Sequence, residues 1–129
     1  HSLLRQYRRF VLVDDSLVRS TTLRILIAMI RDTAEQAGVA RGEIEVHVRV
    51  ASPPIIGCCY YGIDTPEMDE LAAANQTIQE IAKGIDADTL EYLSVAGLDT
   101  VAKEFGNPKD FCHACFTGQY PTEYLPRTR

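Results

Sequence analysis

The sequence has no excess of basic residues and no long apolar run. Its 129 residues include 13 Lys and Arg against 18 Asp and Glu, which gives a net charge of −5. This balance, without any basic cluster, argues against binding to nucleic acid or to a membrane surface. No apolar stretch approaches the roughly 20 residues that a membrane-spanning helix needs. No signal peptide is recognisable, so we expect a cytoplasmic protein.

Internal repeats, low-complexity tracts and linker-like segments are also missing. With 46% hydrophobic and 24% charged residues, the composition is that of a globular domain, and it excludes collagen-like and coiled-coil classes. A chain of this length forms one domain with a usable core. Four cysteines are present, and in the cytoplasm they serve more often as metal or cluster ligands than as disulfides.

The first half of the chain predicts a strand, a helix and a second strand. The apolar run 10–13 has no clear alternation and predicts a short, buried strand, central and parallel in its sheet. Residues 21–37 have the helical spacing of apolar positions, and Gly38 follows as a stop signal. Residues 43–51 alternate and predict a strand, which the prolines after Ser52 terminate. Together they predict a right-handed βαβ unit and therefore an α/β fold with a parallel sheet.

The second half has a more mixed pattern. We expect short helices over 66–74 and 77–83, a strand over 90–93 and a helix over 95–105. The tail from Asn107 is rich in turn formers and contains two cysteines, so it predicts irregular structure. The expected architecture is a parallel sheet with flanking helices, followed by an irregular, cysteine-containing tail.

The most informative segment runs from Val11 to Thr22 and reads VLVDDSLVRSTT. Asp14 and Asp15 follow the apolar strand, at the carboxyl end where open α/β sheets bind ligands. Carboxylates accept hydrogen bonds from ribose hydroxyls, and loop amides at a helix N-terminus bind phosphate. The segment therefore indicates a sugar-phosphate site. A bare Asp-Asp-Ser would more often only cap the following helix, but the full run of twelve residues favours the site.

A second motif lies in the tail, where Cys112 and Cys115 form a C-x-x-C pair. This spacing lets two thiolates bind one metal centre. The pair alone leaves zinc, an iron–sulfur cluster, a redox disulfide and chance all open.

Three motifs, in order, resemble those of the glutamine phosphoribosylpyrophosphate amidotransferase family, whose transferase half is a type I phosphoribosyltransferase. They are VLVDDSLVRSTT, SPPI followed by CYYGID, and FCHACFTGQYPTE. The resemblance extends from Arg9 to Glu123. It implies that residues 1–129 are the C-terminal portion of a phosphoribosyltransferase domain, without the glutaminase domain and the upstream half. His1 in place of a methionine agrees with a fragment, and we expect the fragment alone to be inactive.

The resemblance also implies an activity for the intact enzyme. Ammonia from glutamine displaces pyrophosphate from phosphoribosyl pyrophosphate and gives 5-phosphoribosylamine, the first step of purine biosynthesis. The implied partners are the glutaminase domain, purine nucleotides as feedback inhibitors, and further copies of the chain.

Site residues carry over from the family motifs by position. Asp14 and Asp15 would act in catalysis, holding the ribose and the Mg²⁺ of the pyrophosphate. The 5′-phosphate would bind to the loop residues Ser16, Leu17, Val18, Arg19, Ser20, Thr21 and Thr22. Three ligands of a 4Fe–4S cluster would be Cys59, Cys112 and Cys115, with the fourth outside this chain. Cys58 would be a passenger unless it completes the cluster. His113 could be a substitute ligand if the metal were zinc, but an exposed spacer is the favoured interpretation.

Ser20 departs from the family pattern, which has glycine there. The serine either weakens phosphate binding through its Cβ or contributes its hydroxyl, and the sequence leaves both open. Two alternative functions also stand beside the enzyme. One is a non-catalytic nucleotide-binding module with the same fold, and the other is a structural domain in which the cysteines hold zinc. Arg19 is as readily an exposed loop residue as a phosphate ligand.

Overall fold

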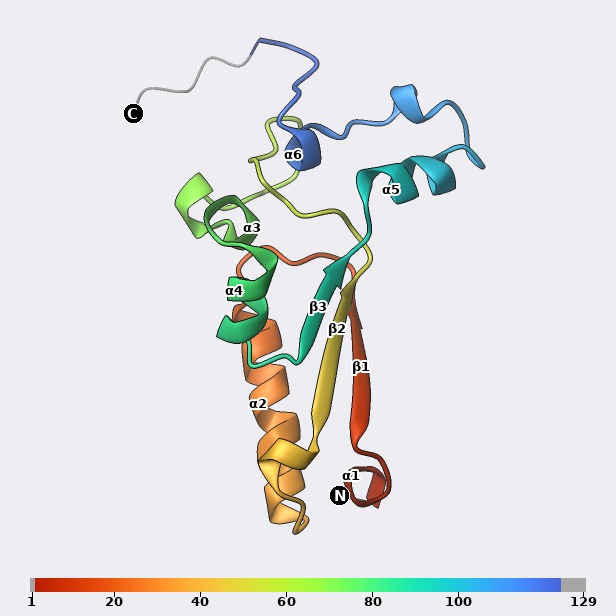
Figure 1. The fold of residues 1–129 in the computed structure, drawn as a ribbon. Coiled ribbons are helices and arrows are strands. Elements are labelled where there is room, and N and C mark those ends of the chain that lie inside the picture. The colour runs from red at the N-terminus through yellow and green to blue at the C-terminus, as the bar shows by residue number, and fades with distance from the viewer. Residues whose placement is uncertain (1, 124–129) are drawn as a thin grey trace.

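Three parallel strands and the helix that links the first two form the frame of the molecule (Figure 1). The computed structural model describes residues 2–123. Strands β1 (Arg9–Asp14), β2 (Glu45–Val50) and β3 (Thr89–Tyr92) lie in the order β1-β2-β3. The register places Asp14 beside Val50 and Val50 beside Tyr92. All three carboxyl ends therefore lie at one edge of the sheet, as the βαβ pattern predicts.

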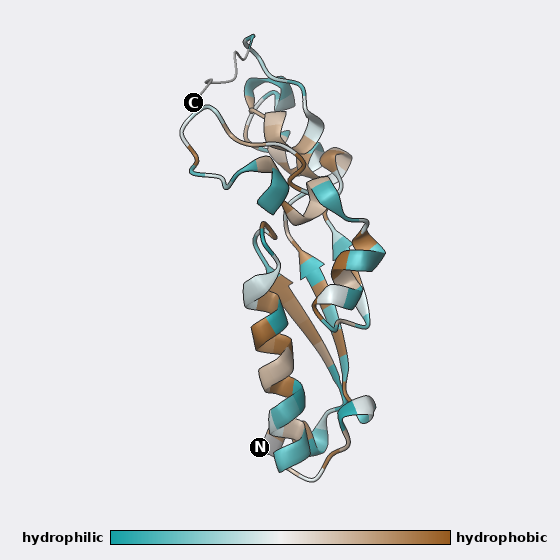
Figure 2. Cartoon of the chain, turned by 90° about the vertical axis from the view of Figure 1, so that its left-hand side faces the viewer, coloured by the Kyte–Doolittle hydropathy of each residue, from teal (hydrophilic) through white to brown (hydrophobic). Residues whose placement is uncertain are grey.

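Helix α2 (Thr21–Gln36) covers one face of this sheet and is amphipathic. Its buried side chains, Leu23, Ile27 and Ala34 among them, pack with the inward side of β2 in the main core. Gly38 follows the helix with a φ of +82°, so the predicted stop is confirmed. Figure 2 shows apolar and polar positions in turn along α2 and along parts of the strands. Burying each large aliphatic side chain of this core contributes roughly 1.5–3 kcal/mol.

A buried arginine ties the opposite end of the sheet together. The side chain of Arg31 is only 8% exposed, and its guanidinium donates to the carbonyl of Ile44 at 2.6 Å and to Asp88 Oδ2 at 3.0 Å. Asp88 Oδ2 also accepts from the backbone amide of Val46 at 2.6 Å. Because a buried guanidinium has to be paired, this network fixes α2 to the starts of β2 and β3.

The predicted central position of β1 is wrong within residues 2–123, although its parallel pairing is confirmed. β1 is an edge strand of the described sheet, and its burial alternates. Val11 is 59% exposed and Val13 is 75% exposed. The reason is that α2 packs on only one face of the sheet, so every second residue of β1 faces outward. A run of consecutive apolar residues does not reveal which of its faces is covered.

The remaining elements are short. They are α1 (Ser2–Gln6), α3 (Ala72–Asn75), α4 (Ile78–Gly84), α5 (Val95–Ala102) and α6 (Ala114–Thr117), with 3₁₀ turns η1 (Arg41–Glu43), η2 (Met68–Glu70) and η3 (Pro108–Asp110). The tail from Asn107 is thus less irregular than predicted, because Cys115 lies on a helical turn. In Figure 1, α5, α6 and the long connections lie beyond the carboxyl ends of the strands. None of the helices in the described part of the chain is both long and apolar enough to cross a membrane.

The single helix predicted over 66–74 is also wrong. Leu71 is extended, with φ −74° and ψ 110°, and separates η2 from α3. The amide of Ala72 donates to the carbonyl of Val18 at 2.9 Å instead of continuing a helix. A tertiary hydrogen bond to the loop after β1 therefore interrupts the local helical pattern.

Candidate functional site

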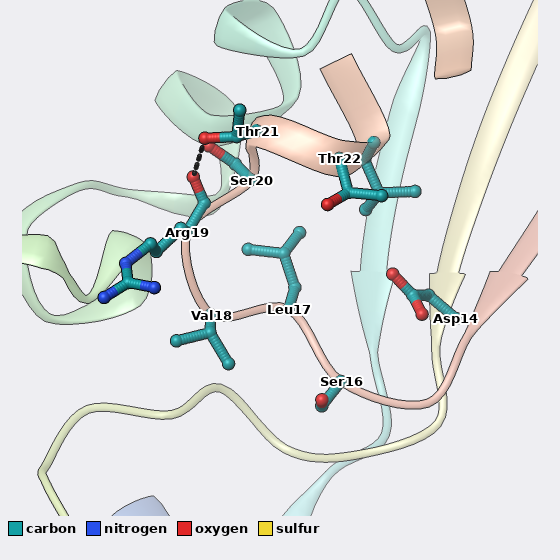
Figure 3. A pocket seen from close by; sticks show the side chains of 9 residues that line it. Asp14, Ser16, Leu17, Val18, Arg19, Ser20, Thr21 and Thr22 are labelled. Carbon is teal, nitrogen blue, oxygen red and sulfur yellow. Dashed lines mark hydrogen bonds between the residues drawn. The ribbon is translucent and has the colours of Figure 1, made fainter. Parts of the chain in front are cut away.

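A cavity of about 570 Å³ lies at the carboxyl end of β1 (Figure 3). One stretch of the chain lines it: the strand end, the β1–α2 loop (residues 15–20) except Asp15, and the first turn of α2. The lining residues are Asp14, Ser16, Leu17, Val18, Arg19, Ser20, Thr21, Thr22 and Leu23. The cavity therefore coincides with the predicted sugar-phosphate segment, and it contains an acid, several hydroxyls and the free amides of a helix start.

Ser20 precedes α2 in the left-handed conformation, with φ 59° and ψ −11°. Its carbonyl accepts the first helical hydrogen bond, from the amide of Arg24 at 3.1 Å. A left-handed residue next to a helix start turns successive amides toward one side, which forms an anion-binding concavity. Glycine adopts this left-handed backbone conformation without strain. Serine adopts it here with a conformational strain of roughly 1–2 kcal/mol. The departure from glycine thus keeps the loop shape.

The side chains of the lining divide into two groups. Leu17 is buried in the main core, and Val18 packs against a second core of Ile55, Cys58 and Leu71. These two residues are the apolar part of the lining and join the loop to both cores. Figure 3 shows the oxygens of Asp14 and Thr22 directed into the same space. That space therefore has a carboxylate on one side and hydroxyls with helix-start amides on the other.

The two aspartates are not equivalent. Asp14 lines the cavity, and its Oδ1 accepts from the backbone amide of Asp15 at 3.0 Å. Asp15 is exposed and lies outside the lining, where Oδ1 accepts from the Ser16 hydroxyl at 3.4 Å. The structure thus places Asp14, but not Asp15, in the lining of the cavity.

Arg19 contributes to the lining, yet its guanidinium is paired with an acid elsewhere. Its Nε and Nη2 donate to Glu70 Oε2 at 2.9 Å and 2.6 Å. Sequence reasoning missed Glu70 altogether. The two residues are 51 positions apart, so no local spacing signals the pair.

The cysteines lie in a separate region, formed by residues 55–66 and 108–122, which we call the cysteine lobe. The amides of Ile56 and Gly57 both donate to the carbonyl of Cys115, at 2.9 Å and 3.0 Å. The Tyr120 hydroxyl donates to the carbonyl of Cys58 at 2.8 Å. These backbone contacts hold two segments, some 60 residues apart in sequence, side by side.

Three thiols of this lobe are near enough to affect one another. Burial raises the pKa of the Cys115 thiol, and the neighbouring Cys59 and Cys112 raise it further. The amide of Tyr61 donates to Cys59 Sγ at 3.4 Å. Within residues 2–123, however, no three His, Cys, Asp or Glu side chains converge on one metal position.

The structure also shows the surroundings of Cys58 and His113. Cys58 is buried in the second core, and its Sγ donates to the carbonyl of Pro66 at 3.3 Å, which is a packing role. His113 is not an exposed spacer, so that prediction is wrong. Its side chain is 18% exposed and lies 3.4 Å from Asp99 Oδ1 on α5. The tail packs against α5, which the turn-rich composition did not indicate.

The chain is similar over most of its length to amidophosphoribosyltransferases. The Archaeoglobus fulgidus protein of that name is 46% identical over 114 residues, which cover 88% of this chain and 23% of the relative. The Bacillus subtilis protein is 46% identical over 126 residues, which cover 94% of this chain and 24% of the relative. No family model matches the chain.

The fold has a matching solved structure. Glutamine phosphoribosylpyrophosphate amidotransferase from B. subtilis, complexed with ADP and GMP, superposes with a TM-score of 0.77 at 45% identity. The match covers 94% of this chain and 25% of that chain. The chain therefore spans about a quarter of the length of these relatives, and the expected α/β fold with a parallel sheet and flanking helices is confirmed.

Proposed function

We propose, from the premise that this chain is homologous to one segment of the amidophosphoribosyltransferases, that it forms the ribose 5-phosphate-binding part of such an enzyme. The whole enzyme would transfer ammonia from glutamine to phosphoribosyl pyrophosphate. The observation that carries the proposal is the cavity at the end of β1. It joins the Asp14 carboxylate to the amide array behind a left-handed Ser20 in one continuous segment.

The reaction asks the protein mainly for positioning and electrostatics. The ammonia nitrogen forms a bond to C1′ while the bond from C1′ to the pyrophosphate oxygen breaks. The bonding pair leaves with pyrophosphate, and the new amine loses a proton to give 5-phosphoribosylamine. Positive charge develops on the ribose ring as the leaving group departs. A carboxylate fixed beside the ring stabilises that charge, and a held phosphate sets the angle of attack.

Each lining group has a role in this scheme. Asp14 accepts hydrogen bonds from the ribose hydroxyls, which contribute roughly 1.5–3 kcal/mol each when the acceptor is charged. The amides and hydroxyls of residues 16–22 hold the 5′-phosphate. Asp15 sits beside the cavity and joins Asp14 in binding ribose or the Mg²⁺ that accompanies pyrophosphate. Mg²⁺ would supply charge neutralisation of the leaving group.

The cysteine lobe would bind a 4Fe–4S cluster through Cys59, Cys112 and Cys115, with a fourth ligand from outside this chain. The donor set of three neighbouring thiols supports this assignment. Such a cluster would supply a covalent tie between the tail and the body of the protein. Absorbance at about 400 nm in anaerobically prepared protein distinguishes an iron–sulfur cluster from colourless zinc.

The remaining properties of the enzyme rest on chain beyond these 129 residues. They are the glutaminase domain that releases ammonia, the assembly of several copies, and a cytoplasmic location. Inhibition by purine nucleotides would act at the same cavity, because they carry a ribose 5-phosphate. The relative solved with ADP and GMP supports nucleotide binding.

The test is pyrophosphate release by the full gene product containing this sequence, with phosphoribosyl pyrophosphate and glutamine or ammonia. We expect release, and a loss of at least about 100-fold in kcat/KM for Asp14→Asn, because the variant removes the charge beside C1′. Asp64→Asn, an exposed acid of the cysteine lobe, is the matched control. Nucleotide binding without any pyrophosphate release would overturn the catalytic proposal in favour of a binding module.

A further inference from the structure

The β1–α2 loop is attached to a segment far away in the sequence. Arg19 pairs with Glu70 of η2 through two nitrogens, at 2.9 Å and 2.6 Å. One residue earlier, the carbonyl of Val18 accepts from the amide of Ala72 at 2.9 Å. The Val18 side chain packs against the second core, which contains Leu71. Residues 18–19 are thus held against residues 70–72 by an ion pair, a backbone hydrogen bond and an apolar contact.

The direction of the Arg19 side chain decides what it does. Figure 3 shows its guanidinium turned away from Thr22 and Asp14, toward the helical segment beside the loop. Glu70 Oε2 neutralises it there. The backbone of Arg19 therefore lines the cavity while its charge serves a different contact. We propose that Glu70 is a positioning residue, which holds the anion-binding loop in its binding shape through Arg19.

The loop needs such a hold because of Ser20. The left-handed backbone of that residue is strained for a non-glycine side chain, and it follows Arg19 directly. A strained conformation persists only where its surroundings determine it. Anchoring Arg19 fixes the backbone immediately before the strained residue. A loop ordered in advance also loses less conformational entropy when a ligand binds.

This inference rests on the proposed ribose 5-phosphate site. Arg19 has one alternative role, which an experiment can distinguish from the anchoring role. In that role, Arg19 would itself bind the phosphate, and Glu70 would only hold it between binding events. Exchanging the two charges distinguishes the roles. The double variant R19E/E70R keeps the pair but places a negative charge on the loop. An anchor tolerates the exchange, whereas a phosphate ligand does not.

The experiment measures ribose 5-phosphate binding calorimetrically in the full gene product. We expect Glu70→Ala to weaken binding about fivefold, since an exposed ion pair contributes on this scale. Arg19→Glu should weaken it at least as much, and R19E/E70R should recover to within about twofold of the parent. Asp69→Ala, the neighbouring exposed acid of η2, is the matched control and should bind as the parent does.

Amide hydrogen exchange of residues 17–22 gives a second readout that needs no ligand. Glu70→Ala should accelerate exchange there, and R19E/E70R should restore the parent rate. The positioning role is overturned if Glu70→Ala changes neither binding nor exchange, or if R19E/E70R binds as weakly as R19E. If the parent protein binds no ribose 5-phosphate while exchange responds as expected, the proposed function fails and the positioning role stands.

Discussion

At the scale of single residues, Ser20 determines the shape of the β1–α2 loop. Its φ of 59° places a Cβ in the left-handed region. Ser20→Gly removes that strain, and we expect it to stabilise the protein by about 1 kcal/mol after the greater freedom of glycine in the unfolded chain is counted. Ser20→Val should destabilise it, because a β-branched residue is a strong outlier there. Urea unfolding midpoints of the two variants and the parent measure the difference.

Ser20 also offers a hydroxyl at the edge of the cavity, and the same pair of variants tests its use. If Ser20→Gly unfolds at a higher urea concentration but binds ribose 5-phosphate less tightly, the hydroxyl contributes to binding. A glycine variant that is less stable than the parent would contradict the strain argument.

Tyr92 gives a pH-dependent prediction at the same scale. Its hydroxyl is buried and finds no hydrogen-bond partner in the described part of the chain, residues 2–123. Burial raises the pKa of Tyr92 to about 12. Because the folded pKa lies above the unfolded value of about 10, this contribution to stability is complete below pH 10. It is then lost as the pH rises toward 12.

Tyr92→Phe removes both the unpaired hydroxyl and the titration. We therefore expect the variant to be at least as stable as the parent at pH 7, since an unsatisfied buried hydroxyl is lost. Between pH 10 and about 12 its stability should fall less steeply than that of the parent. Unfolding curves at several pH values check both points, and parallel pH profiles for the two proteins would refute the assignment.

At the scale of elements, α4 depends on its first turn. Thr77 Oγ1 accepts from the amide of Glu80 at 3.2 Å, and Glu80 Oε2 accepts from the amide of Thr77 at 2.8 Å. The Thr77 hydroxyl also donates to Glu80 Oε2, at 2.9 Å. The bond from the Thr77 amide first, and the bond from its hydroxyl second, lower the pKa of the Glu80 carboxyl. Because the folded pKa lies below the unfolded value of about 4.3, ionised Glu80 stabilises the protein at pH values above that unfolded value. This stabilisation is lost as the pH falls through the folded pKa.

Thr77→Ala should destabilise the protein by about 1 kcal/mol at pH 7, which is typical for loss of a helix cap. Thr77→Ser keeps the oxygen and is the control. The destabilisation caused by Thr77→Ala should become smaller as the pH falls below the folded pKa of Glu80. The reason is that the hydrogen bond from the Thr77 amide to the Glu80 carboxyl weakens when that carboxyl is protonated. A cost that is the same at pH 7 and pH 3 in unfolding experiments would exclude this coupling.

The helices and strands also show which features of the fold can be predicted from one sequence. Helix α2 and strand β2 lie within two residues of their predicted bounds, because their periodicity extends over many positions. The start of α4 is readable too, since Thr77 and Glu80 have the spacing of a capping box, and the predicted helix 77–83 lies within one residue of α4. The break at Leu71 was not readable. It depends on a hydrogen bond from Ala72 to Val18, which only the folded chain brings together.

The same distinction holds for the site. The structure brings Asp14 and the loop residues into the lining of one cavity, and this proximity was predictable because they form one continuous motif. The separation of Asp15 from that cavity depends on a turn of the backbone, which residue types alone do not determine. Glu70 was beyond prediction, since it reaches Arg19 across 51 positions and its segment carries no motif for such a pair.

At the scale of the whole molecule, the described chain leaves apolar surface open on both sides of its frame. Val11 and Val13 point away from α2 along the edge strand β1. Ile25, Leu26 and Met29 are exposed on the outer side of α2. An open edge strand with apolar side chains is a template for pairing with another chain. In relatives about four times as long, further chain is available to cover these surfaces.

We therefore expect the 129-residue chain by itself to self-associate through β1. Replacing Val11 and Val13 with lysine places two like charges along the edge and should shift the sedimentation coefficient toward that of the monomer. Replacing both with isoleucine keeps the apolar edge, and this control should associate like the parent. Since both side chains point out of the core, neither pair of substitutions removes buried contacts with α2. A parent chain that sediments as a monomer at all concentrations and melts cooperatively would show that the edge is not a pairing surface.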